Sequence, residues 1–251
     1  MVSTIILSVL LVVLSLSKEL IMSKRNDIIE PSEWTSTRKT GLVYSEILGW
    51  IDIGHAQGSD IKNLMIDIKR GESGCDGYYE VTYSQKMFVY HRQFGIGKFV
   101  KWRIKQGLSA CEKNSVALAM MMTTARLFES LQSNWCFSWY TDSGFSGEDL
   151  TSDLLGFYRA ILPSDYQSRL RLVSKERALN RWDFYGPIGN YKNKGFLPLL
   201  FPDPLDNCAV HKPYKGSLPS FMTWVQPWSD FTSGRVQVIS GDGGYYSFLS
   251  R

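Results

Sequence analysis

The spacing of hydrophobic and polar residues predicts an antiparallel sheet in the first half of the chain. "GWIDIGHA", which begins at Gly49, has the pattern of a short strand that ends at Gly54. Further alternation of apolar and polar residues, typical of strands with one buried and one solvated face, occupies residues 78–84, 86–92 and 98–105. These three segments predict an antiparallel meander.

From Ser109 onward the pattern predicts helices. Residues 116–128 carry Arg126 as their only charge, and a helix that is apolar on all sides is typical of a buried position. The pairs Ser109–Glu112 and Ser146–Asp149 have the spacing of capping boxes, and each pair predicts the start of a helix. The second helix is predicted to end near Leu162. The remaining predicted elements are a helix near Ser164, a helix over 174–185 and a strand over 234–240.

This order of elements predicts the α+β class: an antiparallel β-meander, a buried central helix, a helical segment and a loop-rich C-terminal part. The chain has 251 residues, of which 44% are hydrophobic, so it is long enough to bury a sizeable core. No linker or low-complexity tract divides it. We therefore expect residues 18–251 to form a single globular domain.

The first 17 residues have the composition of an export signal. The apolar run from Thr4 to Leu16 is too short for a comfortable membrane span, and small residues at 15 and 17 precede Lys18. This pattern predicts a signal peptide that is cut near Ser17. The alternative is an uncleaved anchor that associates with a membrane through the N-terminus. Either one predicts an exported protein, periplasmic or secreted.

Export changes the interpretation of the cysteines. There are four of them, Cys75, Cys111, Cys136 and Cys208, and oxidising compartments favour disulfides. Two bridges with three possible pairings are therefore predicted. The net charge of +4 is mild and spread along the chain, so we do not expect a nucleic-acid partner.

Glu129 is the first candidate for chemistry. It lies near the end of the apolar helix, on the face that Met122 and Ala125 continue. A carboxylate at the end of an apolar stripe is expected to lose water, which raises its pKa and suits it to general acid or base catalysis. The alternatives are an Arg126–Glu129 pair at i,i+3 spacing and a side chain that simply extends into solvent.

His55 and the acidic pair at 148–149 are the other candidates. His55 follows a glycine at a strand end, where loops commonly carry function, although it could equally be a hydrogen-bonded core histidine. Asp52 is not expected to pair with it. Glu148 and Asp149 stand in the first turn of a helix, where the helix dipole alone favours acids. The functional alternative is that Glu148 turns toward Glu129.

Two other candidate sites involve cysteines. Cys111 begins a helix, where thiolate character is favoured, and His55 could serve as its base in a Cys–His hydrolase. Cys208 and His211 could bind a metal, but no second ligand pair stands at zinc-like spacing. The chain has no phosphate-binding loop, GxSxG or HExxH motif. We therefore expect neither a cofactor nor a metal.

Four segments resemble an uncharacterised family of exported bacterial proteins that is known by a domain of unknown function. These are "GWIDIGHA", "FESLQ", "SGFSGEDLTSDLLGFYRA" and "RWDFYGPIGNYKN", and the resemblance covers roughly residues 45–200. It implies an envelope or secreted context, and it places His55, Glu129, Glu148 and Asp149 where the motifs are densest. It implies no activity.

The sequence favours an exported hydrolase that acts on a polymer of the bacterial cell envelope, with peptidoglycan as the most accessible substrate. Glu129 is expected to act as general acid or base, with His55 as a second acid/base group or as an orienting group. A glycosidase would pair Glu129 with Glu148 or Asp149 across the bond. The rival hypothesis is a binding module without activity, which would use the many aromatic residues of the C-terminal part to hold carbohydrate or protein. A lipid substrate also stays open.

Overall fold

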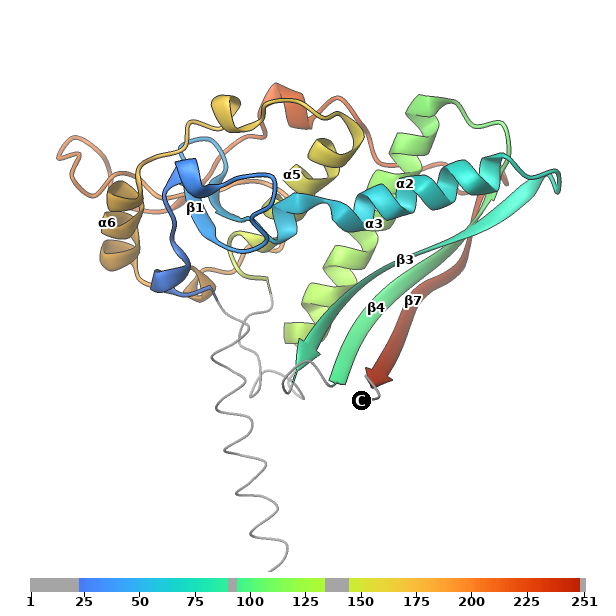
Figure 1. Cartoon of the computed structure of the whole chain (residues 1–251), viewed down its shortest axis with the longest axis horizontal. Coiled ribbons are helices and arrows are strands. Elements are labelled where there is room, and N and C mark those ends of the chain that lie inside the picture. Colours follow the sequence, from blue (N-terminus) through green and yellow to red (C-terminus); the bar gives the residue numbers. More distant parts are fainter. Residues whose placement is uncertain (1–22, 90–93, 134–144, 249–251) are drawn as a thin grey trace, which may run out of the picture.

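A computed structural model describes residues 23–89, 94–133 and 145–248 and shows an α+β fold built on two sheets (Figure 1). The expected fold class is thus confirmed. One sheet has three long strands in the order β3-β4-β7, and the other has four short strands in the order β1-β2-β5-β6. The long sheet lies at one end of the molecule, and the short sheet lies at the other together with helix α6.

The long sheet differs from the predicted meander. Residues 78–84 and 86–92 were expected to be separate strands, but strand β3 runs unbroken over Tyr78–Val89 and pairs antiparallel with β4, Phe94–Lys105. Ser84 and Gln85 between the two apolar runs are polar but contain no turn-forming glycine or proline, so the strand continues through them. The third strand is the C-terminal β7, Val236–Phe248, which extends the predicted last strand.

Helices α2 and α3 contact the strands of this sheet. Helix α3, Ala110–Ser133, confirms the predicted central helix, and its start has both halves of the capping box, with Ser109 N donating to Glu112 Oε2 over 2.8 Å. Helix α2, Ser59–Glu72, was not predicted. Its buried residues Ile61, Leu64 and Ile68 are spaced three and four apart, which is the helical signal in this stretch.

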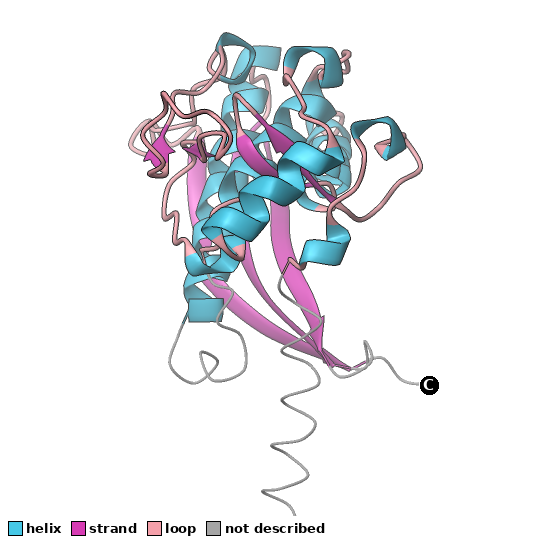
Figure 2. Ribbon diagram, turned by 90° about the vertical axis from the view of Figure 1, so that its left-hand side faces the viewer, coloured by secondary structure: helices cyan, strands magenta, loops and turns pink. Residues whose placement is uncertain are grey.

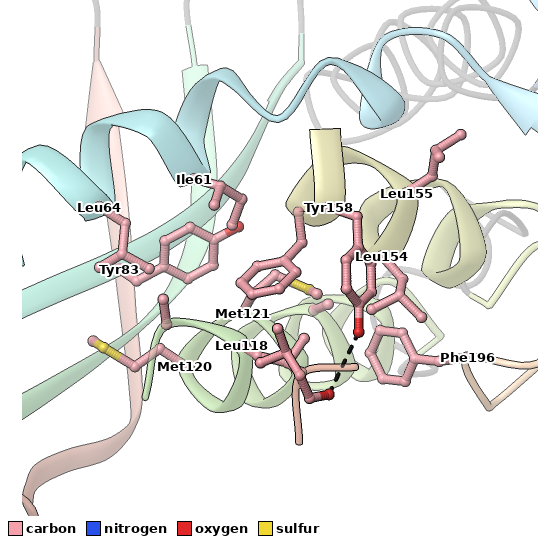
Figure 3. Close-up of a cluster of buried hydrophobic side chains, with 14 of the residues drawn as sticks. Ile61, Leu64, Tyr83, Leu118, Met120, Met121, Leu154, Leu155, Tyr158 and Phe196 are labelled. Atoms are coloured by element: carbon pink, nitrogen blue, oxygen red, sulfur yellow. Dashed lines mark hydrogen bonds between the residues drawn. The ribbon is translucent and has the colours of Figure 1, made fainter. Parts of the chain in front are cut away.

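Helix α5, Asp149–Ile161, packs against both α2 and α3, and Figure 3 shows the core that they share. Its predicted capping box is absent, because Glu148 occupies the N-cap position and makes no side-chain cap. The Ser146 hydroxyl donates to the Glu148 carboxylate instead. A short hydrogen-bonded loop therefore precedes the helix and turns Glu148 inward.

The short sheet consists of β1, Leu42–Ser45, β2, Gly49–Asp52, β5, Leu199–Leu200, and β6, Tyr214–Lys215. Helix α6, Lys175–Tyr185, begins at the N-cap Ser174 as predicted. The helix expected near Ser164 is only a single 3-10 turn over Gln167–Arg169. The C-terminal part is loop-rich until β7, and Figure 2 shows the three long strands behind the helices.

The cysteines do not form the predicted framework. Cys75, Cys111 and Cys208 are exposed free thiols, and Cys136 lies outside the described residues. Two bridges among four cysteines would require at least one bridge among these three, and there is none. The predicted signal segment 1–17 also lies outside the described residues. Within the described part of the chain, no helix combines the length and apolarity needed to cross a membrane.

Candidate functional site

One face of helix α5 holds the segment that carries His55. The residues that α5 turns to this segment are small or polar and recur at helical spacing: Asp149, Ser152, Asp153, Gly156 and Arg159. The backbone N–H of Asp52 at the end of β2 donates to Ser152 Oγ over 3.0 Å, and Arg159 donates to the Ala56 carbonyl over 2.5 Å. His55 therefore sits on a 3-10 turn, His55–Gln57, that is tied to α5 on both sides.

Two glycines allow this close crossing. Gly58 has φ +63°, and a Cβ on it would lie 2.0 Å from the Gly156 carbonyl oxygen. A Cβ on Gly156 would lie 2.6 Å from the carbonyl oxygen of His55. Contacts this short with rigid backbone cannot be relieved by moving a side chain. The absence of both Cβ atoms thus sets the distance between His55 and α5.

We expect Gly156→Ala to destabilise the fold by about 1–3 kcal/mol, the usual cost of overpacking. A glycine-to-alanine change inside a helix ordinarily stabilises by about 0.5–1 kcal/mol, so the expected sign is reversed. Urea unfolding of the variant measures the change. Gly195→Ala is the control, because a Cβ there meets nothing within 4 Å. A stabilised Gly156→Ala protein would contradict the crossing.

His55 and Asp153 form the centre of the site. The Nδ1 atom of His55 lies 2.9 Å from Oδ1 of Asp153, a side chain that is only 7% exposed. The second oxygen of Asp153 accepts a hydrogen bond from Gln85 Nε2 over 3.0 Å. The carboxylate of Asp52 bonds to the backbone: its Oδ1 accepts the N–H groups of Gly54 and His55. The imidazole keeps 35% of its exposure and can therefore meet a substrate.

The surrounding carboxylates favour the charged imidazolium. Burial lowers the pKa of His55, but the charge and hydrogen bond of Asp153 and the charges of Asp52 and Asp149 outweigh burial and raise it well above its ordinary value. The His55 ring is therefore a proton donor at neutral pH.

Glu129 approaches the same point from the end of α3. Its carboxylate is 1% exposed and accepts the backbone N–H of Phe145 over 2.5 Å. Burial raises the pKa of Glu129 to about 7, with the Phe145 hydrogen bond and the positive charge of His55 opposing the rise. The Glu129 side chain is therefore not solvated. Arg126, the alternative partner, lies over the Phe196 ring. Glu129 therefore exchanges a proton near neutral pH.

Phe145 holds an unusual backbone conformation where it meets Glu129. Its φ is +58°, which is rare for a residue with a side chain. Its carbonyl accepts the backbone N–H of Asn193 over 2.8 Å, and the buried Asn193 amide donates to the Leu197 carbonyl. Such conformations persist only where the surrounding structure imposes them, and they cluster at functional sites.

Glu148 and Asp149 complete the acidic group. Glu148 is 2% exposed and accepts the hydroxyls of Ser23 and Ser146. Burial raises the pKa of both acids, and the charges of Glu129 and Glu148 push the pKa of Asp149 well above its ordinary value. Four of the five candidate residues, His55, Glu129, Glu148 and Asp149, thus share one electrostatic cluster.

Cys111 does not join this cluster. It is exposed in the first turn of α3, 18 residues before Glu129. At 1.5 Å per residue the helix separates the two positions by about 27 Å. The charge of His55 lowers the pKa of Glu129, so His55 lies near the Glu129 end of α3. The structure therefore does not bring Cys111 and His55 together as a nucleophile–base pair.

Asp153 and Gln85 are functional residues that the sequence did not predict. Asp153 follows Asp149 by one helical turn, and an acid repeated at this spacing in an apolar helix is the signal that could have indicated it. Gln85 carries no such signal, because only a tertiary contact brings its side chain on β3 to Asp153 on α5.

Among the described residues, no three His, Cys, Asp or Glu side chains are grouped so that they could hold a metal ion. The possible ligands Cys208 and His211 are placed apart from the cluster: His211 is bonded to the Asp206 carbonyl and lies beside Phe184. Comparisons with protein-family models, curated proteins and solved structures found no match to this chain.

Proposed function

We propose that the protein is an exported hydrolase of a bacterial cell-envelope polymer, with peptidoglycan as the first substrate to test, and that it works by general acid–base catalysis at His55 and Glu129. The observation that carries the proposal is the charge interaction between these two groups, each of which is held in place by a hydrogen bond. His55, oriented by Asp153, and Glu129, with a pKa of about 7, come from different elements to one buried acidic cluster. Perturbed groups that gather in this way are typical of catalytic sites.

Glu129 and His55 each carry out one of the two proton transfers that hydrolysis requires. Ionised Glu129 takes a proton from a water molecule, whose oxygen attacks the electrophilic carbon of the substrate. As the bond to the leaving group breaks, the His55 imidazolium donates a proton from Nε2 to that group. Glu129 then releases its proton to solvent and His55 takes one up, which restores the starting state. Asp153 keeps Nδ1 protonated and Nε2 facing the substrate throughout.

This division predicts a bell-shaped pH profile. The rate is expected to rise with pH through about 7 as Glu129 ionises, and to fall at higher pH when His55 loses its proton. Initial rates between pH 5 and 10 measure it. The rising limb is expected to move in Glu129→Asp, which keeps the carboxyl group but changes its surroundings. A rate that declines steadily from pH 5 would contradict the assignment of Glu129 as base.

The test of the function is release of soluble fragments from purified peptidoglycan. We expect the mature chain to release them, and His55→Ala and Glu129→Gln to lose this activity while they stay folded. Cys111→Ser serves as a control and should stay active, because Cys111 stands at the far end of α3 from Glu129; its inactivation would contradict the assignment of the catalytic groups. An inactive parent chain that sediments with peptidoglycan would favour the binding module, for which Trp224, 47% exposed, is one available aromatic surface.

A further inference from the structure

A chain of hydrogen bonds continues from His55 beyond Asp153 to strand β3. Gln85 on β3 donates to Oδ2 of Asp153 over 3.0 Å. Tyr83 stands two residues earlier on the same strand face, and its hydroxyl donates to Oδ2 of Asp60 on α2. Figure 3 shows the Tyr83 ring reaching in beside Ile61 and Leu64 of that helix. Strand β3 thus supplies the polar partner of Asp153, and α2 holds the neighbouring Tyr83.

The Asp153 carboxylate determines the direction of the hydrogen bonds on either side of it. An ionised carboxylate only accepts, so Oδ2 accepts from the NH₂ group of Gln85 and Oδ1 accepts from Nδ1–H of His55. A flipped Gln85 amide would place its carbonyl oxygen against the Asp153 carboxylate. Asp153 accordingly fixes the orientation of the Gln85 amide, and Gln85 in turn holds one oxygen of Asp153.

We propose that Gln85 is a positioning residue for His55. By holding Oδ2 of Asp153 it presents Oδ1 to His55 Nδ1, and this keeps the proton on Nδ1 and directs Nε2 toward the substrate. Tyr83 is 3% exposed and Asp153 is 7% exposed, so water cannot freely replace these partners. The inference rests on the proposed function for its catalytic consequence, but the hydrogen-bond chain can be tested without a substrate.

Loss of Gln85 is expected to act on catalysis and not on substrate binding. Without its N–H donor, Asp153 can rotate away from the ring, and His55 loses a fixed tautomer. We expect Gln85→Leu to lower kcat by about 10- to 100-fold with little change in KM, by analogy with the side chains that orient metal-bound histidines. In an Asp153→Asn background the same change should cost almost nothing further, since both variants break one chain.

The test is NMR of the full chain with ¹⁵N-labelled histidine, which follows the His55 Nδ1 proton directly. We expect this proton to exchange slowly with water in the parent and at least tenfold faster in Gln85→Leu. Gln85→Glu keeps the shape but replaces the donor with an acceptor, and it should act in the same direction. Tyr83→Phe should have a smaller effect. Gln106→Leu is the control, because Gln106 bonds to the Gly71 carbonyl at the other end of the sheet.

Unchanged Nδ1 exchange in folded Gln85→Leu and Gln85→Glu would overturn the proposal. Faster exchange in both, with no effect of Gln106→Leu, supports it. If exchange responds in this way while the parent releases nothing from peptidoglycan, the positioning role stands and the proposed substrate fails. The two proposals are thus separable.

Discussion

Glu129→Gln is expected to stabilise the folded protein at pH 8 by about 3 kcal/mol while it abolishes hydrolysis. The ordinary pKa of a glutamate is 4.5, and burial raises that of folded Glu129 to about 7. Between these values the folded state binds more protons than the unfolded state, so stability falls as pH rises. Glutamine has no charge to bury and escapes this penalty. It can still accept the Phe145 N–H through its amide oxygen.

Urea unfolding at two pH values measures this effect. At pH 5 most folded and many unfolded chains carry a protonated Glu129, so the gain should shrink to less than about 1 kcal/mol. Glu112→Gln, at the other end of α3, is the control of opposite sign. Arg235 and Ser109 stabilise the Glu112 carboxylate and lower its pKa to about 2, so its loss should destabilise the fold at pH 8. A Glu129→Gln gain that is equal at pH 5 and pH 8 would exclude the buried charge as its cause.

Removing the His55–Asp153 pair should lower activity by a large factor. We expect His55→Ala to lower the rate of fragment release by about 10²- to 10⁴-fold, the usual contribution of a general acid or base. Asp153→Asn should approach the same loss, because it keeps the shape but removes the charge that holds the proton on His55. The pKa of His55 should then fall toward its ordinary value, which leaves less imidazolium at neutral pH.

Rates of fragment release at saturating peptidoglycan, compared with the parent, measure this loss. His211→Ala is the matched control, since His211 is exposed beside Phe184 and stands apart from the cluster. Circular dichroism and urea unfolding show whether each variant is folded. An active Asp153→Asn protein would mean that His55 needs no carboxylate partner and would remove Asp153 from the mechanism.

The sequence indicates the burial of Glu129, but it does not indicate the partner of His55. The apolar run of α3 places a carboxylate at its end, where packing against neighbouring elements removes water, and periodicity alone indicates this. The glycines around His55 likewise indicate room for the ring. The partnership of Asp153 with His55 and Gln85 depends on tertiary contacts between α5, β3 and the turn at His55. The helical spacing of Asp149 and Asp153 indicates a shared face, but no local pattern indicates which residues that face meets.

Two elements, β3 and α2, differ from the predicted secondary structure because polar or charged residues interrupt their apolar pattern. The polar pair Ser84 and Gln85 predicts a break between two strands, but β3 continues through it and uses Gln85 to hold Asp153. Ser84 lies on the exposed face of β3, whereas Gln85 is a polar residue on the face of Tyr83, which is buried. A polar residue on the inner face departs from the local pattern, and such departures are expected at functional sites. Helix α2 was missed because its charged residues mask an apolar stripe of only three buried side chains. Local sequence patterns were therefore least informative in β3, one of the elements that build the site.

The most direct test of the central claim is an NMR titration of His55 in the parent chain and in Glu129→Gln, with His55→Gln used to assign its signals among the three histidines. We expect the pKa of His55 to lie well above 6.5, and its signals to show an additional step near pH 7 that disappears in Glu129→Gln. That result would place both groups in one acid–base site. A His55 pKa at or below 6.5, unaffected by Glu129→Gln, would contradict the shared site.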